Sequence, residues 1–419
     1  MNLALKLYLI IILNVLYSYS VTAQNNYTLQ KALQLAKTNN PILKTEHYNV
    51  SIAQSDIITA GLRPNPILNN QTLQLMQTSQ FSTAQNWYNV ENRQVLWQLT
   101  KQFQIAGQRA NKIDLANKNV SVSEKNYAEI ERNLFAEVAE KWLEVWAAQK
   151  QLNIIEIAQN NIDSLIITNQ VRFKNQVITQ IDLLRTELLA KQYALQYKTS
   201  YQEVINKQKE LAFLLGSKDS VSIDVSDNFT YTIPANFNSL VNQSLQQRSD
   251  IVTVKSLIDV SNSNVKLQKS LAYPQPELGF IWNPQNTVPY FGIYINIDLP
   301  IFSRNQGEIK KSHLLKNQAD QQLFTIQDQL QTEISNAFAS YQLQHQNLES
   351  FNTLLLQAQT ILDSVKYAYL NGGTTIIDFL EAQRSWLETQ QQYYETMQQY
   401  RLSYIQLLYT TGLINQLAQ

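Results

Sequence analysis

The sequence contains no cysteine and little charge. Without cysteine there are no disulfides, thiolate metal sites, cysteine nucleophiles or lipidated cysteines. Lys, Arg, Asp and Glu together make up 16% of the 419 residues and the formal net charge is zero, so no basic field predicts a nucleic-acid partner. Glycine and proline occur only nine times each. No Gly- or Pro-rich linker therefore divides the chain into separate domains.

Long apolar runs are also missing beyond the N-terminus. Residues 1–23 have the pattern of a secretory signal peptide, with Lys6 before an apolar core and small residues before Gln24. An uncleaved membrane anchor is the alternative, although the apolar core is short for a bilayer span. No later run is long enough for a transmembrane helix. We therefore expect an exported protein that is periplasmic, secreted or an outer-membrane barrel.

Two motifs of the chain recur in the same order. Residues 173–184 resemble residues 369–380 after a shift of 196 positions. The Pro-x-Pro segment 63–68 returns 210 positions later, at 273–278. Because chance rarely produces two such matches in order, the sequence predicts two tandem repeats that share one plan.

Each predicted repeat has the same series of elements. The first covers residues 24–216 and the second 236–419, with a short lateral linker segment at 217–235 of the equatorial type. The initial helices, 29–62 and 237–272, are expected to end at the two Pro-x-Pro segments, because proline lacks an N–H donor. The later elements are β-hairpins at 67–104 and 277–299, long helices at 106–170 and 306–370, and return helices at 182–215 and 378–412.

Alternation of apolar and polar residues indicates the strands. In residues 290–299, Phe291, Ile293 and Ile295 face one way while Tyr294 and Asn296 face the other, as in a transmembrane barrel strand. A half-buried strand of a soluble sheet is the alternative. Four strands cannot close around an open lumen, and strand edges must be paired inside a bilayer, so several copies are expected to share one barrel. The predicted strands are 67–76, 94–104, 277–283 and 290–299.

The long helices carry apolar residues at seven-residue steps. Ile334, Tyr341, Leu348, Leu355 and Leu362 form one such series in the second half. This spacing predicts antiparallel coiled-coil packing. Helices of about 65 residues would be rods of roughly 100 Å. The predicted fold class is thus mainly α with a membrane β-barrel, and its long antiparallel coiled-coil helices lie in two tandem repeats.

Together, these features resemble the TolC family of outer-membrane efflux proteins over essentially the whole mature chain. The resemblance implies a homotrimer in which each protomer gives four strands to one membrane β-barrel, in contact with outer-membrane lipid, while the helices form a tunnel. It also implies a periplasmic adaptor and an inner-membrane pump as partners. Residues 299–309 are similar to the strand-to-helix junction of the cobalt–zinc–cadmium heavy-metal branch. Residues 105–109 are similar to a family turn, with Ala106 in place of its first glycine.

The resemblance also assigns residues to the two periplasmic tips of the helical hairpins. The family has a Tyr/Phe-x-x-Gly motif there, which this chain keeps at its second tip as Tyr369 to Gly372, whereas Gln176 replaces the glycine at the first tip. The implied tip-turn and adaptor-docking residues are Asn371, Gly372, Gly373, Asn175 and Gln176.

Two further roles at the tips follow from the same resemblance. Asp378 and Glu381 lie three apart on a predicted helix and match an acidic ring that constricts the closed tunnel. From the residues alone, Asp378 is instead a helix cap and Glu381 a solvated charge. Tyr369 and Asp182 fall on a donor–acceptor pair that latches the closed state, while Thr374 stands where a second latch uses an arginine.

No arrangement of residues predicts catalysis. The three histidines, His47, His313 and His345, are scattered over predicted helices, so neither a metal site nor a cofactor is expected. We predict a non-enzymatic outer-membrane exit duct for small substrates such as metal cations or drugs. The alternatives are a protein-secretion duct of the same family and a structural coiled-coil envelope protein without a pore.

Overall fold

The computed structural model describes residues 26–80, 92–219, 221–229, 236–284 and 289–419. The predicted signal peptide lies outside these residues, as do residues 230–235 of the predicted linker segment. The described chain forms two compact units, each built from segments distant in sequence. Unit 1 comprises the N-terminal residues up to Leu43, Glu131–Ser244 and Thr332–Gln419, and unit 2 comprises Lys44–Ile130 and Leu245–Gln331.

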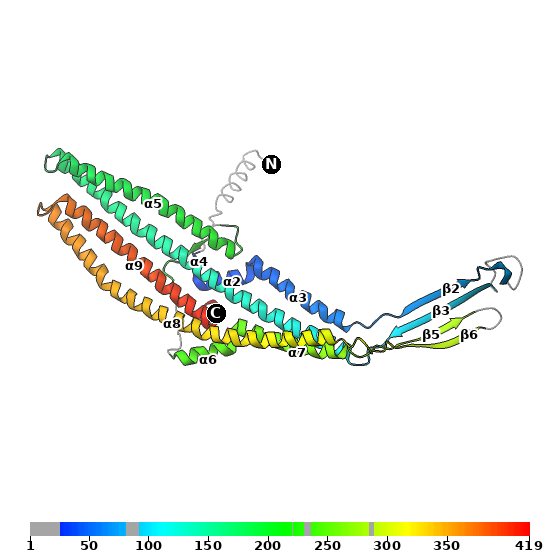
Figure 1. Cartoon of the computed structure of the whole chain (residues 1–419). Coiled ribbons are helices and arrows are strands. Elements are labelled where there is room, and N and C mark those ends of the chain that lie inside the picture. Colours follow the sequence, from blue (N-terminus) through cyan, green and yellow to red (C-terminus); the bar gives the residue numbers. More distant parts are fainter. Residues whose placement is uncertain (1–25, 81–91, 220, 230–235, 285–288) are drawn as a thin grey trace, which may run out of the picture. The chain divides into compact units, whose positions relative to one another are not determined.

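The chain is mainly helical, as the sequence predicts, and Figure 1 shows the order of its elements. Four long helices dominate: α4 (Gln108–Lys174), α5 (Gln180–Leu214), α8 (Gln306–Leu370) and α9 (Ile376–Thr411). Within the described residues, none of the helices has a stretch long and apolar enough to cross a membrane. The shorter elements are β1 (Asn26–Tyr27), α2 (Leu29–Asn39), α3 (Pro41–Gly61), the 3₁₀ helix η1 (Thr78–Gln80), β4 (Ser222–Ile223), α6 (Phe237–Gln247), α7 (Ser249–Ser270) and the 3₁₀ helix η3 (Ile414–Ala418).

Two predicted helices are each broken into two. Residues 29–62 were expected to form one helix, but α2 ends at Asn39 and α3 begins at Pro41. Asn40 is extended (φ −58°, ψ 127°) because the ring of the following proline disfavours a helical conformation there. Its side-chain oxygen accepts a hydrogen bond from the Ile42 N–H at 2.8 Å, which caps the new helix. In the second half, Arg248 is likewise extended (φ −64°, ψ 128°) and separates α6 from α7.

The core of unit 1 lies between the helical hairpins α4/α5 and α8/α9. Trp142 and Trp146 of α4 are almost fully buried, and their indole N–H groups donate to the backbone oxygens of Tyr27 and Val225 at 3.0 and 3.1 Å. These bonds hold the short parallel pair of β1 and β4 against α4. Near the tips, a second apolar cluster joins all four helices and includes Leu165, Leu189, Leu362, Phe379 and Trp386.

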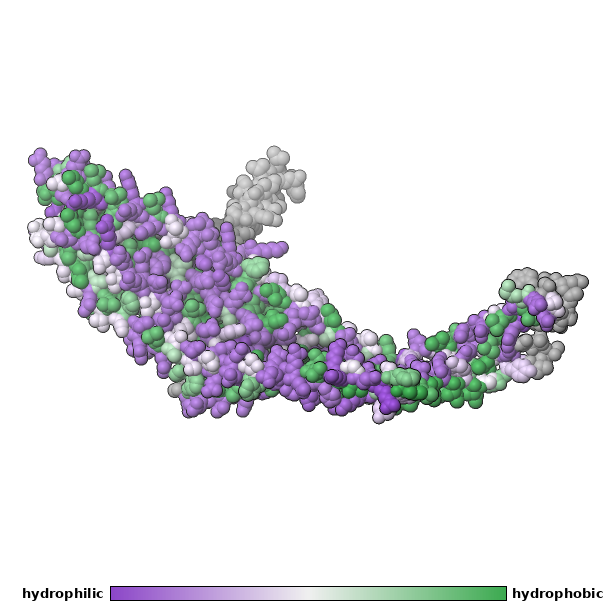
Figure 2. Space-filling model, in the orientation of Figure 1, coloured by the Kyte–Doolittle hydropathy of each residue, from purple (hydrophilic) through white to green (hydrophobic). Residues whose placement is uncertain are grey.

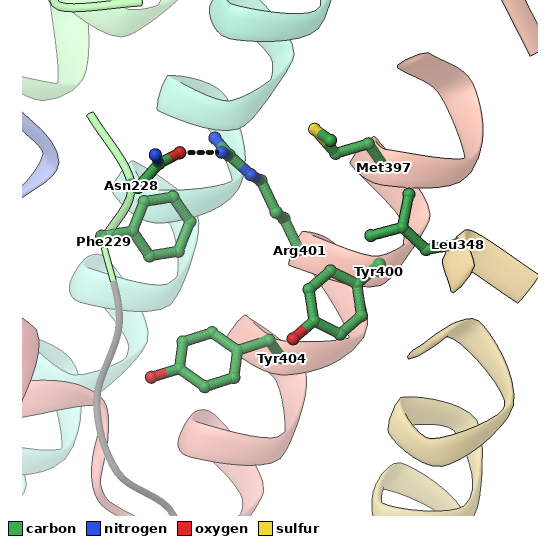
Figure 3. Close-up of a pocket in the computed structure, with 7 residues that line it drawn as sticks. All are labelled: Asn228, Phe229, Leu348, Met397, Tyr400, Arg401 and Tyr404. Atoms are coloured by element: carbon green, nitrogen blue, oxygen red, sulfur yellow. Dashed lines mark hydrogen bonds between the residues drawn. The ribbon is translucent and has the colours of Figure 1, made fainter. Parts of the chain in front are cut away.

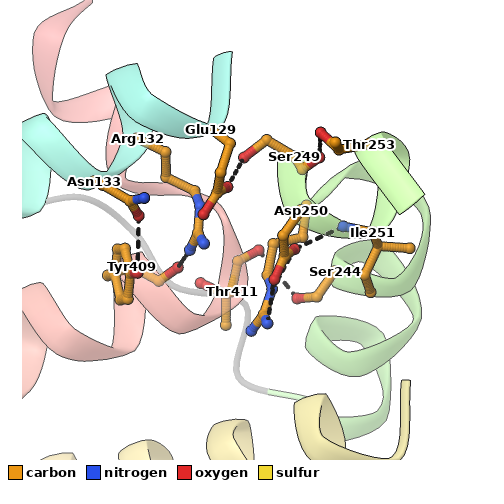
Figure 4. A network of polar contacts seen from close by, with 11 residues as sticks. Glu129, Arg132, Asn133, Ser244, Ser249, Asp250, Ile251, Thr253, Tyr409 and Thr411 are labelled. Carbon is orange, nitrogen blue, oxygen red and sulfur yellow. Dashed lines mark hydrogen bonds and ion pairs between the residues drawn. The ribbon is translucent and has the colours of Figure 1, made fainter. Parts of the chain in front are cut away.

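Polar contacts fix the C-terminal end of α9 within unit 1 (Figure 4). The Arg132 guanidinium donates to the Tyr409 backbone oxygen at 2.8 Å and lies 4.2 Å from the centre of its ring. The Tyr409 hydroxyl donates in turn to Asn133 at 2.9 Å. On the other side, the Ser244 hydroxyl donates to the Thr411 backbone oxygen at 3.0 Å. Helices α4 and α6 are thereby tied to the end of α9.

Unit 2 contains a four-stranded antiparallel sheet in the order β2 (Ile67–Gln74), β3 (Arg93–Gln102), β5 (Glu277–Asn283) and β6 (Tyr290–Asn296). The sheet is open, with β2 and β6 at its edges. Apolar side chains along β5 and β6 are exposed, and Figure 2 shows this apolar surface in green. The exposed side chains on these two strands include Phe280, Trp282, Phe291, Ile293 and Ile295.

Candidate functional site

The two tips of the helical hairpins in unit 1 have the same turn. At the second tip, the N–H of Gly372 donates to the backbone oxygen of Tyr369 at 3.1 Å. The N–H of Gly373 donates to the backbone oxygen of Ala368 at 2.8 Å. At the first tip, the backbone N–H of Gln176 donates to the backbone oxygen of Phe173 at 2.9 Å. The N–H of Val177 donates to the backbone oxygen of Arg172 at 2.8 Å. Both sets are the hydrogen bonds of a Schellman motif, which requires one left-handed residue after the helix.

Gln176 and Gly372 are those left-handed residues. Their φ angles are +59° and +79°, and they lie 196 positions apart in the sequence. Gln176 therefore adopts a conformation that glycine reaches without steric cost. The sequence left the conformation of the first tip open, because glutamine gives no local signal for it. The structure shows the glycine-type turn at both tips.

Each return helix then begins with a reciprocal capping box. The Thr375 hydroxyl caps the Asp378 N–H, and the Asp378 carboxylate accepts the Thr375 N–H at 3.1 Å. Thr179 and Asp182 form the same pair at the start of α5. Within the single chain, Asp378 therefore takes part in the cap of its own helix. Both carboxylates satisfy backbone N–H groups that the first helical turn would otherwise leave unpaired.

Hydrogen bonds from two hydroxyl groups stabilise the ionised form of the Asp378 carboxyl. Its Oδ2 atom accepts hydrogen bonds from the hydroxyls of Thr374 and Thr375, both at 2.6 Å. These bonds lower the pKa of the Asp378 carboxyl below its ordinary value, because they favour the ionised form. Its Oδ1 atom accepts no hydrogen bond from the described part of the chain. Asp378 and Glu381 are both exposed on α9, so the two charges are available to groups outside the chain.

A buried polar junction joins the two hairpins just behind the tips. The Tyr369 hydroxyl of α8 donates to the Asn169 side-chain oxygen of α4 at 2.7 Å. The Asn169 amide donates to the Thr186 hydroxyl of α5 at 2.9 Å. Asn169 and Thr186 are completely buried and Tyr369 is 3% exposed. Burial raises the pKa of the Tyr369 hydroxyl, which keeps it a proton donor.

This junction differs in detail from the predicted latch. Within the chain, no hydrogen bond joins Tyr369 to Asp182, whose carboxylate instead caps its own helix. An arginine does reach Tyr369, but from α4: the Arg172 guanidinium lies 4.6 Å from the ring centre and donates to the Tyr369 backbone oxygen at 3.1 Å. Thr374, at the predicted arginine position, donates to Asp378.

Asn169, Thr186 and Arg172 were not predicted as site residues from the sequence. A signal for Asn169 was present, because it continues the seven-residue series of Ile155 and Ile162, which are both buried. A polar residue on an apolar heptad position needs a partner when it is buried. Tyr369 continues the corresponding series after Leu362. The two polar residues meet because both series end at the tips.

A groove of about 330 Å³ lies beside this junction between α4, α8 and α9. Its apolar wall includes Leu165, Leu362 and Phe379, and its rim carries Asp363 and Lys366. The groove therefore combines an apolar floor with charges of both signs. Such a surface suits a packed helix of another protein.

The chain is similar to several known proteins. Residues 240–413 match the family model described as outer membrane efflux protein. The cobalt-zinc-cadmium resistance protein CzcC of Cupriavidus metallidurans is 20% identical over 366 residues, which cover 85% of this chain and 83% of CzcC. The pyoverdine export outer membrane protein OpmQ of Pseudomonas putida is 22% identical over 294 residues, covering 65% of this chain and 60% of OpmQ.

Solved structures share the fold. A crystal structure of CusC, studied for conformational changes that accompany folding and transmembrane channel formation, superposes with a TM-score of 0.76 at 17% identity. The match covers 92% of both chains.

The paired helical hairpins and the four-stranded antiparallel sheet belong to a fold that this chain shares with CusC. The family-model match and the relatives support an outer membrane efflux protein of the TolC family. Its homologues are outer membrane efflux channels, which are non-enzymatic.

Proposed function

We propose that this protein is the outer-membrane exit duct of a tripartite efflux system, through which small substrates such as metal cations or drugs leave the cell passively. The observation that carries the proposal is the pair of identical capped tips, one of which presents Asp378 and Glu381 on an exposed helix face. An inner-membrane pump supplies the energy, and a periplasmic adaptor connects the pump to the tips.

In this proposal the protein is a homotrimer. The open sheet supplies the reason, because the edges of β2 and β6 must be paired where lipid replaces water. Three copies give twelve strands in a closed barrel, and the exposed apolar side chains of β5 and β6 face lipid. The same apolar surface argues against a structural envelope spacer, which has no use for it.

The acidic residues of the tip form the constriction of the closed duct. Three copies of Asp378 and Glu381 around one axis give a ring that attracts cations and excludes anions. The predicted adaptor-docking residues Asn371, Gly372, Gly373, Asn175 and Gln176 form the outer ends of the tips. The groove between α4, α8 and α9 extends that docking surface along the hairpins.

The names of the two relatives contain two classes of substrate. CzcC is named for cobalt, zinc and cadmium resistance and OpmQ for pyoverdine export. The higher coverage of CzcC favours metal cations for this chain. A protein-secretion duct is the second candidate within the family, but no residue of the tips specifically favours it.

Single-channel conductance in a planar bilayer tests the duct and the ring together. The purified protein should conduct, and hexamminecobalt(III) added at the tip side should block the current. The double variant Asp378→Asn with Glu381→Gln keeps the side-chain shapes and a capping oxygen but removes both charges. It should lose most of the block, whereas Glu395→Ala, an exposed charge farther along α9, should keep it.

The possible failures are distinct. A parent protein that never conducts would refute the duct. A conducting double variant that is blocked as readily as the parent would refute only the acidic ring.

A further inference from the structure

A pocket of about 200 Å³ lies in unit 1 between α8, α9 and the segment that follows β4 (Figure 3). It lies away from the tips, and neither the proposed transport nor adaptor docking accounts for it. Most of its lining is apolar or aromatic. The lining residues are Asn228, Phe229, Leu348, Met397, Tyr400, Arg401 and Tyr404.

Arg401 is the only charged residue in this lining, and it has no ion-pair partner in the described part of the chain. Its NH2 group donates to the Asn228 side-chain oxygen at 2.7 Å and its NH1 group to the Asp227 backbone oxygen at 3.4 Å. The Asp227 carboxylate accepts instead from the Leu29 N–H at 2.8 Å. A guanidinium carries more N–H donors than these two bonds use.

Aromatic rings enclose the same guanidinium. Its central carbon lies 4.2 Å from the centre of the Trp146 ring and 5.5 Å from that of Phe229. Figure 3 shows Arg401 reaching from α9 toward Asn228, with Phe229 nearby. Burial lowers the pKa of Arg401, because its charge loses hydration, and the attraction of the Asp227 charge only partly opposes this effect. The site therefore holds a positive charge that an anion would stabilise.

We propose that this pocket binds a small aromatic carboxylate, with the carboxylate on Arg401 and the ring against Phe229 and Tyr400. A planar guanidinium matches a carboxylate through two parallel hydrogen bonds. The apolar walls favour a ligand whose remaining part is an aromatic ring.

The chemistry of the pocket excludes other classes of ligand. A cationic ligand would be repelled by Arg401. Inorganic phosphate would lose its hydration against walls that offer few polar groups. Drug-sized ligands occupy sites of roughly 300–1,000 Å³, so a pocket of about 200 Å³ suits a single ring with one substituent.

The competing explanation is that Arg401 serves only to hold residues 227 and 228 against α9 and to stack on Trp146. In that case the buried charge is a cost of local structure, and the pocket binds no anion. The two explanations predict different results for a neutral ligand of the same shape.

Fluorine NMR and isothermal titration calorimetry on the full-length protein in detergent test the proposal, with 4-fluorobenzoate as the probe. We expect saturable binding with a dissociation constant of about 1 mM or lower. 4-Fluorobenzamide, which has the same shape without the charge, should bind at least about tenfold more weakly. Inorganic phosphate should not displace the probe.

Three variants locate the site. Arg401→Gln should weaken benzoate binding at least about tenfold, because it removes the charge-assisted hydrogen bonds. Arg384→Gln, an exposed arginine on the same helix and outside the pocket, should leave binding unchanged. Met397→Trp keeps Arg401 but fills the pocket, and should also abolish binding.

The proposal is overturned if the fluorobenzoate does not saturate below about 20 mM, if the benzamide binds equally well, or if Arg401→Gln binds like the parent. Should Arg401→Gln fail to fold, Met397→Trp decides: unchanged binding overturns the assignment, and lost binding supports it. None of these measurements requires conductance, so they do not depend on the proposed duct.

Discussion

The left-handed residue of the first tip has a direct consequence for stability. Gln176 has a φ angle of +59° in a turn whose counterpart uses Gly372. Because a side chain in this conformation costs about 1 kcal/mol, Gln176→Gly should raise the free energy of unfolding by about that amount. Thermal unfolding followed by circular dichroism measures the change.

The control for this substitution is the neighbouring position. Asn175 follows the last residue of α4 and is not left-handed, so Asn175→Gly should give no increase and a small loss. Equal effects of the two substitutions would contradict the assignment of strain to Gln176.

The buried tyrosines offer a matched pair of substitutions. Tyr369 and Tyr193 are both 3% exposed, but the Tyr369 hydroxyl donates to buried Asn169 whereas the Tyr193 hydroxyl has no partner in the described chain. Tyr369→Phe should destabilise the protein by about 1–3 kcal/mol, since it leaves the Asn169 acceptor unpaired. Tyr193→Phe should be neutral or stabilising.

Chemical denaturation measures both variants. Burial raises the pKa of Tyr193 to about 12, which agrees with a phenol that loses hydration and gains no hydrogen bond. A larger loss for Tyr193→Phe than for Tyr369→Phe would show that the junction behind the tips contributes little.

At the scale of the elements, the capping box of α9 makes its stability depend on pH. Hydrogen bonds from Thr374 and Thr375 lower the pKa of Asp378 from its ordinary 3.8 in the folded state. A carboxyl with a lowered folded-state pKa contributes stability that is present above 3.8 and is lost as the pH falls through the lower, folded-state pKa. Asp378→Ala should therefore lower the melting temperature at pH 7 but have little effect once the parent carboxyl is protonated.

Melting curves of the parent and of Asp378→Ala across acidic pH test this dependence. Glu381→Ala is the control, because Glu381 does not take part in the capping box. A melting-temperature difference for Asp378→Ala that stayed constant down to the lowest pH would show that the carboxylate charge does not stabilise the cap.

Much of the element order was predictable from the sequence, because it follows from periodicity. The heptads of α8 and the alternation in β6 extend over several residues, so each pattern remains recognisable when one position departs from it. The break at Asn40 was predictable from Pro41, whereas Arg248 carries no comparable local signal. At the tips, the capping threonines follow from sequence rules. The left-handed Gln176 does not, because it is imposed by the hydrogen bonds of the turn around it.

At the scale of the whole molecule, the open sheet predicts a specific pairing between copies. If three copies close one barrel, β2 of one copy lies beside β6 of the next. Because the chain has no cysteine, single cysteines can be placed without background: Asn70→Cys in β2, combined in turn with Gly292→Cys, Ile293→Cys or Tyr294→Cys in β6. Oxidation should give covalent trimers for at least one register.

Denaturing gel electrophoresis detects the cross-linked species. Thr72→Cys with Val95→Cys is the control pair, because these residues face each other on β2 and β3 of one chain and should cross-link without linking copies. Monomers and dimers alone, in every register, would contradict the trimer.

The two unpaired strand edges also determine the order in which the protein can be made. The long helices satisfy their backbone hydrogen bonds internally, so a single chain can form them as soon as it is exported. The sheet is different, because the outer N–H and C=O groups of β2 and β6 have no partner until another chain arrives. In the proposed trimer, completion of the sheet therefore requires collisions between chains, and its rate rises with chain concentration. Until the proposed trimer forms, each chain exposes a template on which foreign strands can pair, so the proposal requires that export and assembly be matched in rate.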